Sequence, residues 1–248
     1  QRQMCIRDSI WTLDANRMRT TRWKIEQNMH KITSVETVDM DKRLVRALDF
    51  YPMESGFLVT DYLGEYRQKW TDQQGKWINS TNEIPTRKYN EKISRPILAQ
   101  AWRSFIDYNP QKKILAMATQ LGEVLEIYNF KDSVQFIIYG PHGEPEFQST
   151  PSDAIPIGIM GFSDIQITDN YIYTVFHGKT FKEIEQALKQ GKKTEDGGYY
   201  IYVFDLAGNL VRKYILDHAI YGIYVNEDTG TILATDVNND EPILQFKI

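Results

Sequence analysis

The sequence contains a single cysteine and no long hydrophobic run. Cys5 has no partner within the 248 residues, so an internal disulfide bond is excluded. No apolar stretch approaches the about 20 residues that a membrane-spanning helix needs. The first nine residues are polar, lack the apolar centre of a signal peptide and read as foreign sequence. We therefore expect residues 1–9 to be a non-native or disordered segment and residues 10–248 to form a partial folded domain.

An excess of positive charge is also absent. Lysine and arginine number 29 against 33 aspartate and glutamate residues, which gives a formal net charge of −4. Proteins that bind nucleic acids need a basic surface to neutralise phosphates. The short basic pairs 112–113 and 192–193 fall in predicted loops and are interpreted as solvated surface. The sequence therefore predicts no nucleic-acid partner.

Signatures of catalysis are missing as well. The sequence has no Gly-x-Ser-x-Gly turn and no phosphate-binding loop, and its histidines do not have metal-ligand spacing. These histidines are His30, His142, His177 and His218. The acidic segment 236–241 is interpreted as a polar turn, with a calcium site as the alternative. We accordingly predict no catalytic residue, no metal site and no cofactor.

What the sequence does contain is a repeat of β-type segments. Aromatic residues make up 12% of the chain, which favours strands. Residues 48–65 align without a gap with residues 106–123. Asp49 falls on Asp107, and Leu-Gly-Glu closes both copies. Each copy reads as a strand, a turn containing proline, a second strand and a glycine turn.

A second signature is a hairpin whose turn begins with an aspartate or asparagine. It occurs at Asp14, Asp72, Asn129 and Asp205, which are separated by 58, 57 and 76 residues. Such side chains bond the backbone two residues further on, so they suit a tight turn. The insertion 179–198 accounts for the longest interval.

Together these signatures predict units of four short strands in a meander. Repeated four-stranded sheets indicate a β-propeller, with a sandwich or barrel of hairpins as the alternative. We expect strands at 10–14 and 19–25 in unit one; at 45–50, 57–61, 66–70 and 77–80 in unit two; at 104–108, 114–118, 124–128 and 134–139 in unit three; at 162–168, 171–176, 199–204 and 210–216 in unit four; and at 221–225, 231–235 and 243–248 in unit five. The aromatic residues Trp70, Tyr128 and Phe204 are predicted to pack in the cores of these units.

The C-terminal half resembles the TolB-like six-bladed propeller proteins of Bacteroides and its relatives. The resemblance rests on residues 161–173, 178–180, 200–209 and 211–217, and extends over about residues 40–248. It implies an all-β, six-bladed propeller of four-stranded antiparallel blades, of which about four and a half are present. It also implies a lipoprotein of the cell envelope (periplasm or outer membrane) whose lipid anchor is missing from this chain. The family offers no catalytic residues to carry over.

Residues 180–189 are predicted to form a short helix. Phe181, Ile184 and Leu188 share one face, Thr180 can cap the start, and Gly191 can end it. The helix lies between the second and third strands of unit four. It is either a flap over the mouth of the propeller channel or a surface helix packed on its own blade.

The candidate ligand-binding residues lie where the first strand of each unit enters the channel mouth. They are Arg46, Arg103, Asp164 and Tyr221. Converging charged side chains of this kind can hold a polar ligand, or they can satisfy one another and the waters between them.

These observations favour a non-catalytic binding or scaffold propeller that holds a protein or glycan partner. The alternative is a calcium-dependent or glycan-processing hydrolase that uses the channel mouth. That alternative needs several acidic or histidine side chains converging on the propeller axis, and Asp164 alone is too few.

Overall fold

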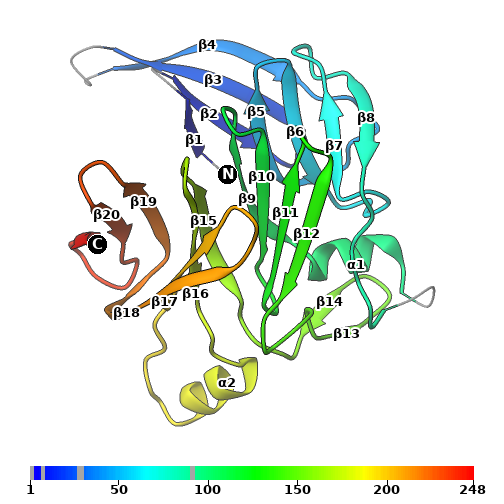
Figure 1. Ribbon diagram of the computed structural model, residues 1–248. Helices are drawn as coiled ribbons and strands as arrows, with labels where there is room; N and C mark the ends of the chain where they lie inside the picture. The colour runs from blue at the N-terminus through cyan, green and yellow to red at the C-terminus, as the bar shows by residue number, and fades with distance from the viewer. Residues whose placement is uncertain (1–2, 7–8, 27–30, 90–92) are drawn as a thin grey trace. The chain divides into compact units, whose positions relative to one another are not determined.

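The computed structural model describes residues 3–6, 9–26, 31–89 and 93–248, which consist mainly of antiparallel β-sheets (Figure 1). The chain divides into two compact units. The first comprises residues 1–85 and 91–100, and the second comprises residues 86–90 and 101–248. None of the described helices is long and apolar enough to cross a membrane.

The first unit contains two four-stranded sheets and helix α1 (Arg95–Ala101), whose last residue falls in the second unit. One sheet consists of β1 (Gln3–Ile6), β2 (Ser9–Asp14), β3 (Arg19–Ile25) and β4 (Ile32–Asp39). The other consists of β5 (Ala47–Met53), β6 (Gly56–Asp61), β7 (Gln68–Thr71) and β8 (Trp77–Thr81). In both sheets the spatial order of the strands follows the chain, as in a meander.

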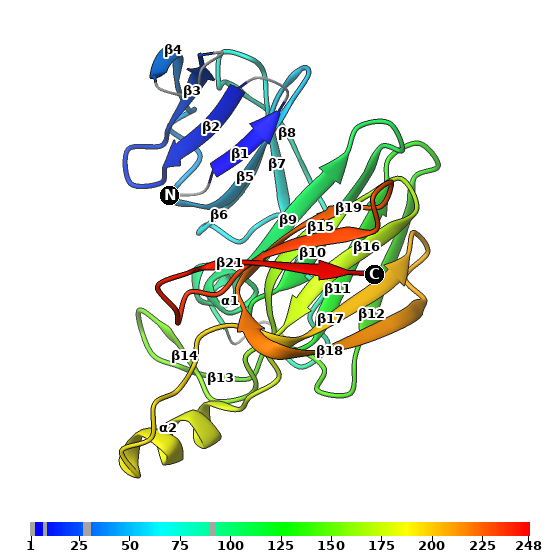
Figure 2. The same ribbon diagram turned by 90° about the vertical axis from the view of Figure 1, so that its left-hand side faces the viewer.

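The second unit repeats this arrangement three times (Figure 2). Its first sheet consists of β9 (Ser104–Asn109), β10 (Ile114–Thr119), β11 (Val124–Asn129) and β12 (Val134–Tyr139). The next consists of β15 (Phe162–Ile167), β16 (Tyr171–Phe176), β17 (Gly198–Asp205) and β18 (Leu210–Ile220), with helix α2 (Phe181–Lys189) between β16 and β17. The last has three strands, β19 (Gly222–Asn226), β20 (Thr231–Thr235) and β21 (Ile243–Lys247). A small hairpin, β13 (Phe147–Ser149) and β14 (Ala154–Pro156), joins the first two sheets along the chain.

Hydrophobic side chains lie between successive sheets and form the cores. In the second unit, Leu125 and Ile127 of β11 cluster with Phe162 and Phe176 of the next sheet. A second cluster places residues of β16 and β17 against Ile232 of β20. Within each unit, successive sheets therefore bury apolar side chains against each other, which is the packing of propeller blades.

The sequence repeat corresponds to a repeated backbone geometry. The Oδ1 atoms of Asp49 and Asp107 each accept the N–H of the next residue, at 2.8 and 2.9 Å. Gly64 and Gly122 have φ values of 66° and 71°, which L side chains rarely adopt. A Cβ atom on Gly122 would lie 2.6 Å from the backbone nitrogen of Pro145, so glycine is required there.

The predicted turns are confirmed at all four positions. The Oδ1 atoms of Asp14, Asp72, Asn129 and Asp205 each accept a backbone N–H from the second residue after them, at 3.0–3.1 Å. Tyr128 and Phe204 are buried, as predicted, and Trp70 is half-buried.

Three features differ from the sequence prediction. The first sheet has four strands, because β1 and β4 flank the two predicted strands, 10–14 and 19–25. Strand β4 was missed because its side chains are mostly exposed and carry no alternating apolar pattern. Helix α1 and the β13–β14 hairpin lie in segments for which the sequence predicts no strand or helix. Strand β1 lies within residues 1–9, and the non-native origin of that segment stays a prediction.

Candidate functional site

Polar side chains on the inner strands of the second unit join neighbouring sheets. The Asp107 carboxylate of β9 accepts the N–H of Ile167 in β15 at 2.8 Å. Gln166 of β15 makes two bonds to Val225 of β19: its amide donates to the carbonyl at 3.1 Å, and its carbonyl accepts the N–H at 2.6 Å. Asp107 and Gln166 lie on the first strands of two successive sheets, β9 and β15. These side chains thus hold the first strands of consecutive sheets together.

Asp164, a predicted ligand-binding residue, takes part in the same linkage. Its Oδ2 atom accepts the N–H of Ile223 at 2.8 Å. Tyr221 lies on the neighbouring segment, and its carbonyl accepts the Ser163 hydroxyl at 2.8 Å. The structure therefore brings Asp164 and the Tyr221 backbone onto adjoining strands. Ligand binding by either residue stays a prediction.

The two predicted arginines lie just before inner strands. Arg103 is exposed, and its carbonyl accepts the N–H of Gln120 at 2.8 Å. Arg46 belongs to the first unit and has a φ of 48°. Its guanidinium lies 5.5 Å from the centre of the Tyr62 ring. The structure thus assigns Arg46 a local cation–π contact and leaves its predicted ligand role untested.

The acidic segment 236–241 forms the turn between β20 and β21, as the sequence predicts. Asp236 is buried and accepts the backbone N–H of Asn238 at 2.9 Å and the side-chain amide of Asn239 at 2.5 Å. Backbone and side-chain bonds to Asn238 lower the pKa of Asp236. Among the described residues, no group of three or more His, Cys, Asp or Glu side chains could hold a metal ion. The Asp236 carboxylate is therefore engaged within its own turn.

Of the three histidines that the structure describes, His177 is the buried one with a shifted pKa. It lies directly after β16, and burial, reinforced by nearby Lys179, lowers its pKa to about 4. Its Nδ1 atom accepts the N–H of Lys179 at 3.3 Å. A neutral imidazole at this position helps to fix the start of the α2 insertion. His30 lies outside the described residues.

The insertion that carries α2 is held at both ends. At its start, the N–H of Met160 donates to the Lys179 carbonyl at 2.9 Å, and the N–H of Phe181 donates to the Gly158 carbonyl at 3.0 Å. At its end, Asp196 donates its N–H to the Asn238 side chain and accepts that side chain's amide, both at 2.9 Å. Hydrogen bonds therefore attach both ends of the insertion to other residues of the second unit.

Helix α2 itself is capped as predicted but buries nothing. Thr180 and Glu183 form a capping box, and Gly191 follows the last turn with a φ of 70°. None of the nine helical residues is buried, and Leu188 is 59% exposed. In both ribbon views the helix projects beyond the sheets of its own unit (Figures 1 and 2). Phe181 and Ile184 are half-buried, so Leu188 is the exposed residue of the apolar face of α2.

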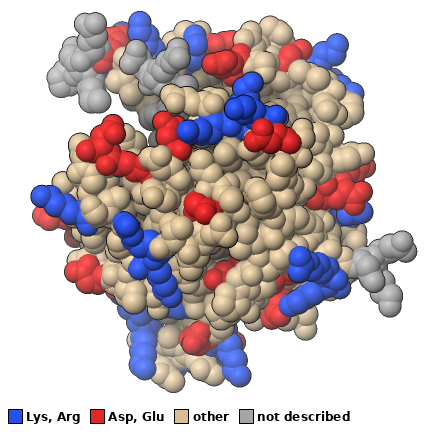
Figure 3. Space-filling view, in the orientation of Figure 1, with Lys and Arg blue, Asp and Glu red and all other residues tan. Residues whose placement is uncertain are grey.

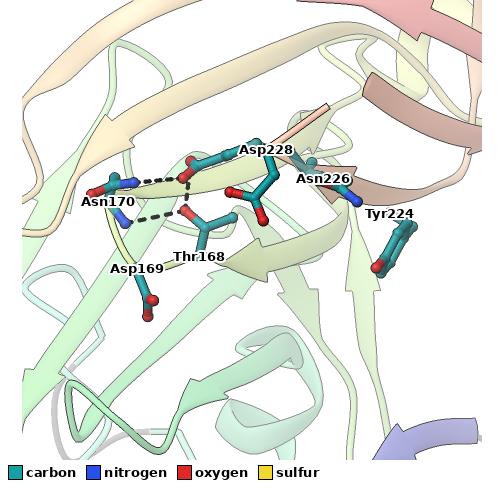
Figure 4. A pocket seen from close by; sticks show the side chains of 8 residues that line it. Thr168, Asp169, Asn170, Tyr224, Asn226 and Asp228 are labelled. Atoms are coloured by element: carbon teal, nitrogen blue, oxygen red, sulfur yellow. Dashed lines mark hydrogen bonds between the residues drawn. The ribbon is translucent and has the colours of Figure 1, made fainter. Parts of the chain in front are cut away.

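A shallow recess of about 300 Å³ lies at the opposite ends of the strands (Figure 4). The turn between β15 and β16 forms one wall, and the end of β19 with the following turn forms the other. The lining residues are Thr168, Asp169, Asn170, Tyr224, Val225, Asn226, Glu227 and Asp228. The predicted site lies at the other end of the blades, and none of these residues was predicted to belong to it. A usable signal was the polar sequence of both turns, 168–170 and 226–228.

Glu227 organises the floor of this recess. Its carboxylate accepts bonds from Thr168 and Asn170, each at 2.7 Å, and from the Tyr173 hydroxyl at 3.0 Å. Burial, followed by the Glu227 charge, raises the pKa of Tyr173 above its ordinary value. Tyr173 therefore stays protonated and donates. The two walls of the recess are fixed to each other through one carboxylate.

Charged side chains of both signs are interspersed on the face that Figure 3 shows. On the face in Figure 3, basic and acidic side chains alternate among neutral residues. The mixture of both signs on this face fits the small formal net charge of −4.

Comparisons with known proteins place these observations in a family. A family model described as TolB-like 6-blade propeller-like matches residues 2–228. No curated protein matches the chain. Among solved structures, a chain of the mitotic checkpoint complex is similar, with a TM-score of 0.52 and 10% identity over 97% of this chain. The present chain spans only 58% of that protein.

Two bacterial structures are also similar. BamB from Moraxella catarrhalis has a TM-score of 0.47 and 9% identity, over 99% of this chain and 71% of its own. A protein of unknown function from Bacteroides caccae has a TM-score of 0.48 and 9% identity, over 86% of this chain and 65% of its own. The match of the family model over residues 2–228, together with successive meander sheets packed face to face, shows that this chain belongs to the TolB-like six-bladed propeller family.

Proposed function

We propose that this chain is a non-catalytic binding or scaffold propeller of the bacterial cell envelope that holds a protein partner through helix α2. The observation that carries the proposal is a firmly anchored, amphipathic helix with no buried residue. The envelope location is part of the proposal and rests on the family resemblance.

Presenting such a helix to a partner has an energetic cost. A nine-residue helix is marginal in isolation, so its stability here depends on the capping box and the two anchors. Residues of a surface helix normally bury an apolar stripe against their own core. Here Phe181 and Ile184 are only half-buried, and Leu188 is 59% exposed. An amphipathic helix of this kind can dock its apolar face into a groove on another protein.

The inner strands support the same conclusion. Their polar side chains, Asp107, Asp164 and Gln166, bond backbone groups of the neighbouring sheet. They therefore contribute to the stiffness of the scaffold that presents the helix.

The proposal is tested by cross-linking from the helix surface. A photoreactive residue at Leu188 lies on the apolar face, whereas one at Gln186 lies on the polar face of the same helix. With the full chain in envelope extracts, we expect one discrete cross-linked protein from position 188 and none from position 186. Ile184→Asp is expected to abolish this product, because a charge on the apolar stripe opposes burial.

The matched variant Gln186→Asp is expected to keep the product. Equal products from positions 186 and 188, or a product that survives Ile184→Asp, would contradict docking through the apolar face.

A further inference from the structure

Strand β12 is the outer strand of the first sheet of the second unit, and its free edge lacks the usual protection. Within the described residues only β11 pairs with it, over all six residues and without a register shift (Figure 1). Its sequence, Val-Gln-Phe-Ile-Ile-Tyr, contains no charge, proline or glycine. Open edges are normally blunted by charged residues, proline or β-bulges, because they can pair with another strand. None of these features occurs in β12.

The other four-stranded sheets carry such features on their outer strands. Strand β4 contains Glu36 and Asp39, and its pairing with β3 shifts register. Strand β8 has five residues, and its pairing with β7 also shifts. Strand β18 contains Arg212 and Lys213, and its pairing with β17 shifts twice. The unprotected edge is therefore particular to β12 and is not a general property of these sheets.

Backbone groups at alternate residues of β12 point away from β11. The N–H of Gly140, directly after the strand, donates to the Glu123 carbonyl at 2.8 Å. In an antiparallel pair alternate residues bond to the partner strand, so the even-numbered residues of β12 face β11 as Gly140 does. The N–H and carbonyl groups of Gln135 and Ile137 then face outward. Within the described part of the chain, no group from outside the sheet bonds to residues 134–138.

Apolar side chains flank this open edge. Val134 is 41% exposed and Phe136 is 37% exposed, and both share a face of the strand with Ile138. Ile138 packs against the core that the sheet forms with its neighbour, whereas Val134 and Phe136 extend along the outer part of the same face. A strand added at this edge therefore covers apolar surface as well as backbone groups.

A second copy of β12, running antiparallel, matches this edge. With Phe136 opposite its own copy, Gln135 lies opposite Ile137 and Val134 lies opposite Ile138. Opposite residues share a face, so the apolar side chains of one face meet each other, and the outward-facing backbone groups bond in pairs. No charged side chains oppose each other in this register, because the strand has none. The edge therefore complements itself and requires no foreign strand.

We infer that two copies of this chain associate through antiparallel pairing of their β12 strands, about a two-fold axis next to Phe136. A symmetric pair of this kind is closed, because each copy contributes the same edge. A contact made by one strand from each copy falls below the about 1,200 Å² of standard interfaces, so we expect a weak dimer that depends on concentration. The inference is independent of α2 and of the partner proposed for that helix.

Analytical ultracentrifugation of the full chain over about a hundredfold range of concentration tests the inference. We expect a reversible equilibrium between monomer and dimer. Phe136→Lys should weaken the dimer about tenfold, because two lysines then face each other across the axis. An equimolar mixture of Phe136→Lys and Phe136→Glu should restore dimers, because opposite charges meet at the same place. Ile215→Lys, at an exposed residue of β18, is the matched control and should dimerise like the parent chain.

Gln135→Pro tests the backbone pairing without introducing a charge. It removes an outward-facing N–H and keeps the bonds to β11, so it should also prevent dimerisation, whereas Gln135→Ala should not. Circular dichroism shows whether each variant is folded. A chain that stays monomeric throughout, or that assembles into particles larger than dimers, overturns the inference. It is also overturned if Phe136→Lys dimerises like the parent chain, or if the lysine and glutamate variants do not associate.

Discussion

At the scale of single residues, half-buried polar side chains on the inner strands of the second unit bond to the backbone. Asp107, Asp164 and Gln166 are spaced along two inner strands, and each satisfies backbone groups of the following sheet. Buried polar groups without such partners are costly, so their placement is tightly constrained. Charge on an inner strand of this fold is therefore weak grounds for assigning a ligand.

His177 provides a residue-scale prediction about pH. Its pKa of about 4 in the folded chain lies below the about 6.5 of an unfolded histidine, so the unfolded state binds the extra proton first. Its contribution to stability is therefore complete above pH 6.5 and is lost as the pH falls from 6.5 towards 4. At pH 5 we expect a loss of about 2 kcal/mol relative to pH 7.

Urea unfolding at the two pH values measures this loss. His177→Asn keeps an acceptor for the Lys179 N–H and should lose about 2 kcal/mol less than the parent chain on acidification. His218→Gln, in which an exposed histidine is replaced, should behave as the parent does. If His177→Asn lost as much stability as the parent, another group would be responsible.

At the scale of elements, nearby residues determine where helix α2 begins, and the strands on either side determine its place in the fold. The capping box sets where the helix begins, and bonds from Thr180 lower the pKa of Glu183. The strands β16 and β17 on either side determine where the insertion joins the sheet. Because no helical residue is buried, helix and core are energetically separable.

Thr180→Ala should therefore destabilise the helix and leave the core intact. Loss of an N-cap costs about 1 kcal/mol, which should raise the opening of α2 about fivefold. Hydrogen exchange of the amides of residues 184–190 measures this opening. Thr180→Ser retains the cap oxygen and should exchange like the parent chain. Equal exchange in both variants, or a drop in global stability, would argue against a separable helix.

At the scale of the whole molecule, repeated sheets depend on the bonds that join their inner strands. Gln166 makes two of these bonds to Val225. Gln166→Leu would leave the Val225 N–H and carbonyl without these partners, and we expect a loss of about 2 kcal/mol in the free energy of unfolding.

Gln166→Glu keeps an acceptor for the N–H and loses the donor, so its loss should be intermediate. Gln148→Leu changes an exposed glutamine of the β13–β14 hairpin and should have little effect. Thermal and urea unfolding give both comparisons. Similar stability for Gln166→Leu and Gln148→Leu would show that the cross-sheet bonds contribute nothing.

Much of the architecture was determined by the sequence itself. The turns at Asp14, Asp72, Asn129 and Asp205 are set by bonds within a few residues, so their spacing reveals the repeat. Strands with alternating or fully apolar patterns were predicted to within about three residues, apart from β18, which extends further. Strand β4 was missed because its exposed residues carry no apolar signal. The limits of α2 followed from its cap and its glycine.

Only the tertiary structure decided what the polar residues do. Asp164 appeared available for a ligand because its partner, the Ile223 backbone, lies 59 residues away along the chain. The recess was not predicted because Glu227 joins turns from two different sheets. A turn's own conformation is a local property of its sequence. The surface that two turns form together depends on how their sheets pack. The local sequence of one turn does not indicate which turn of another sheet it will contact.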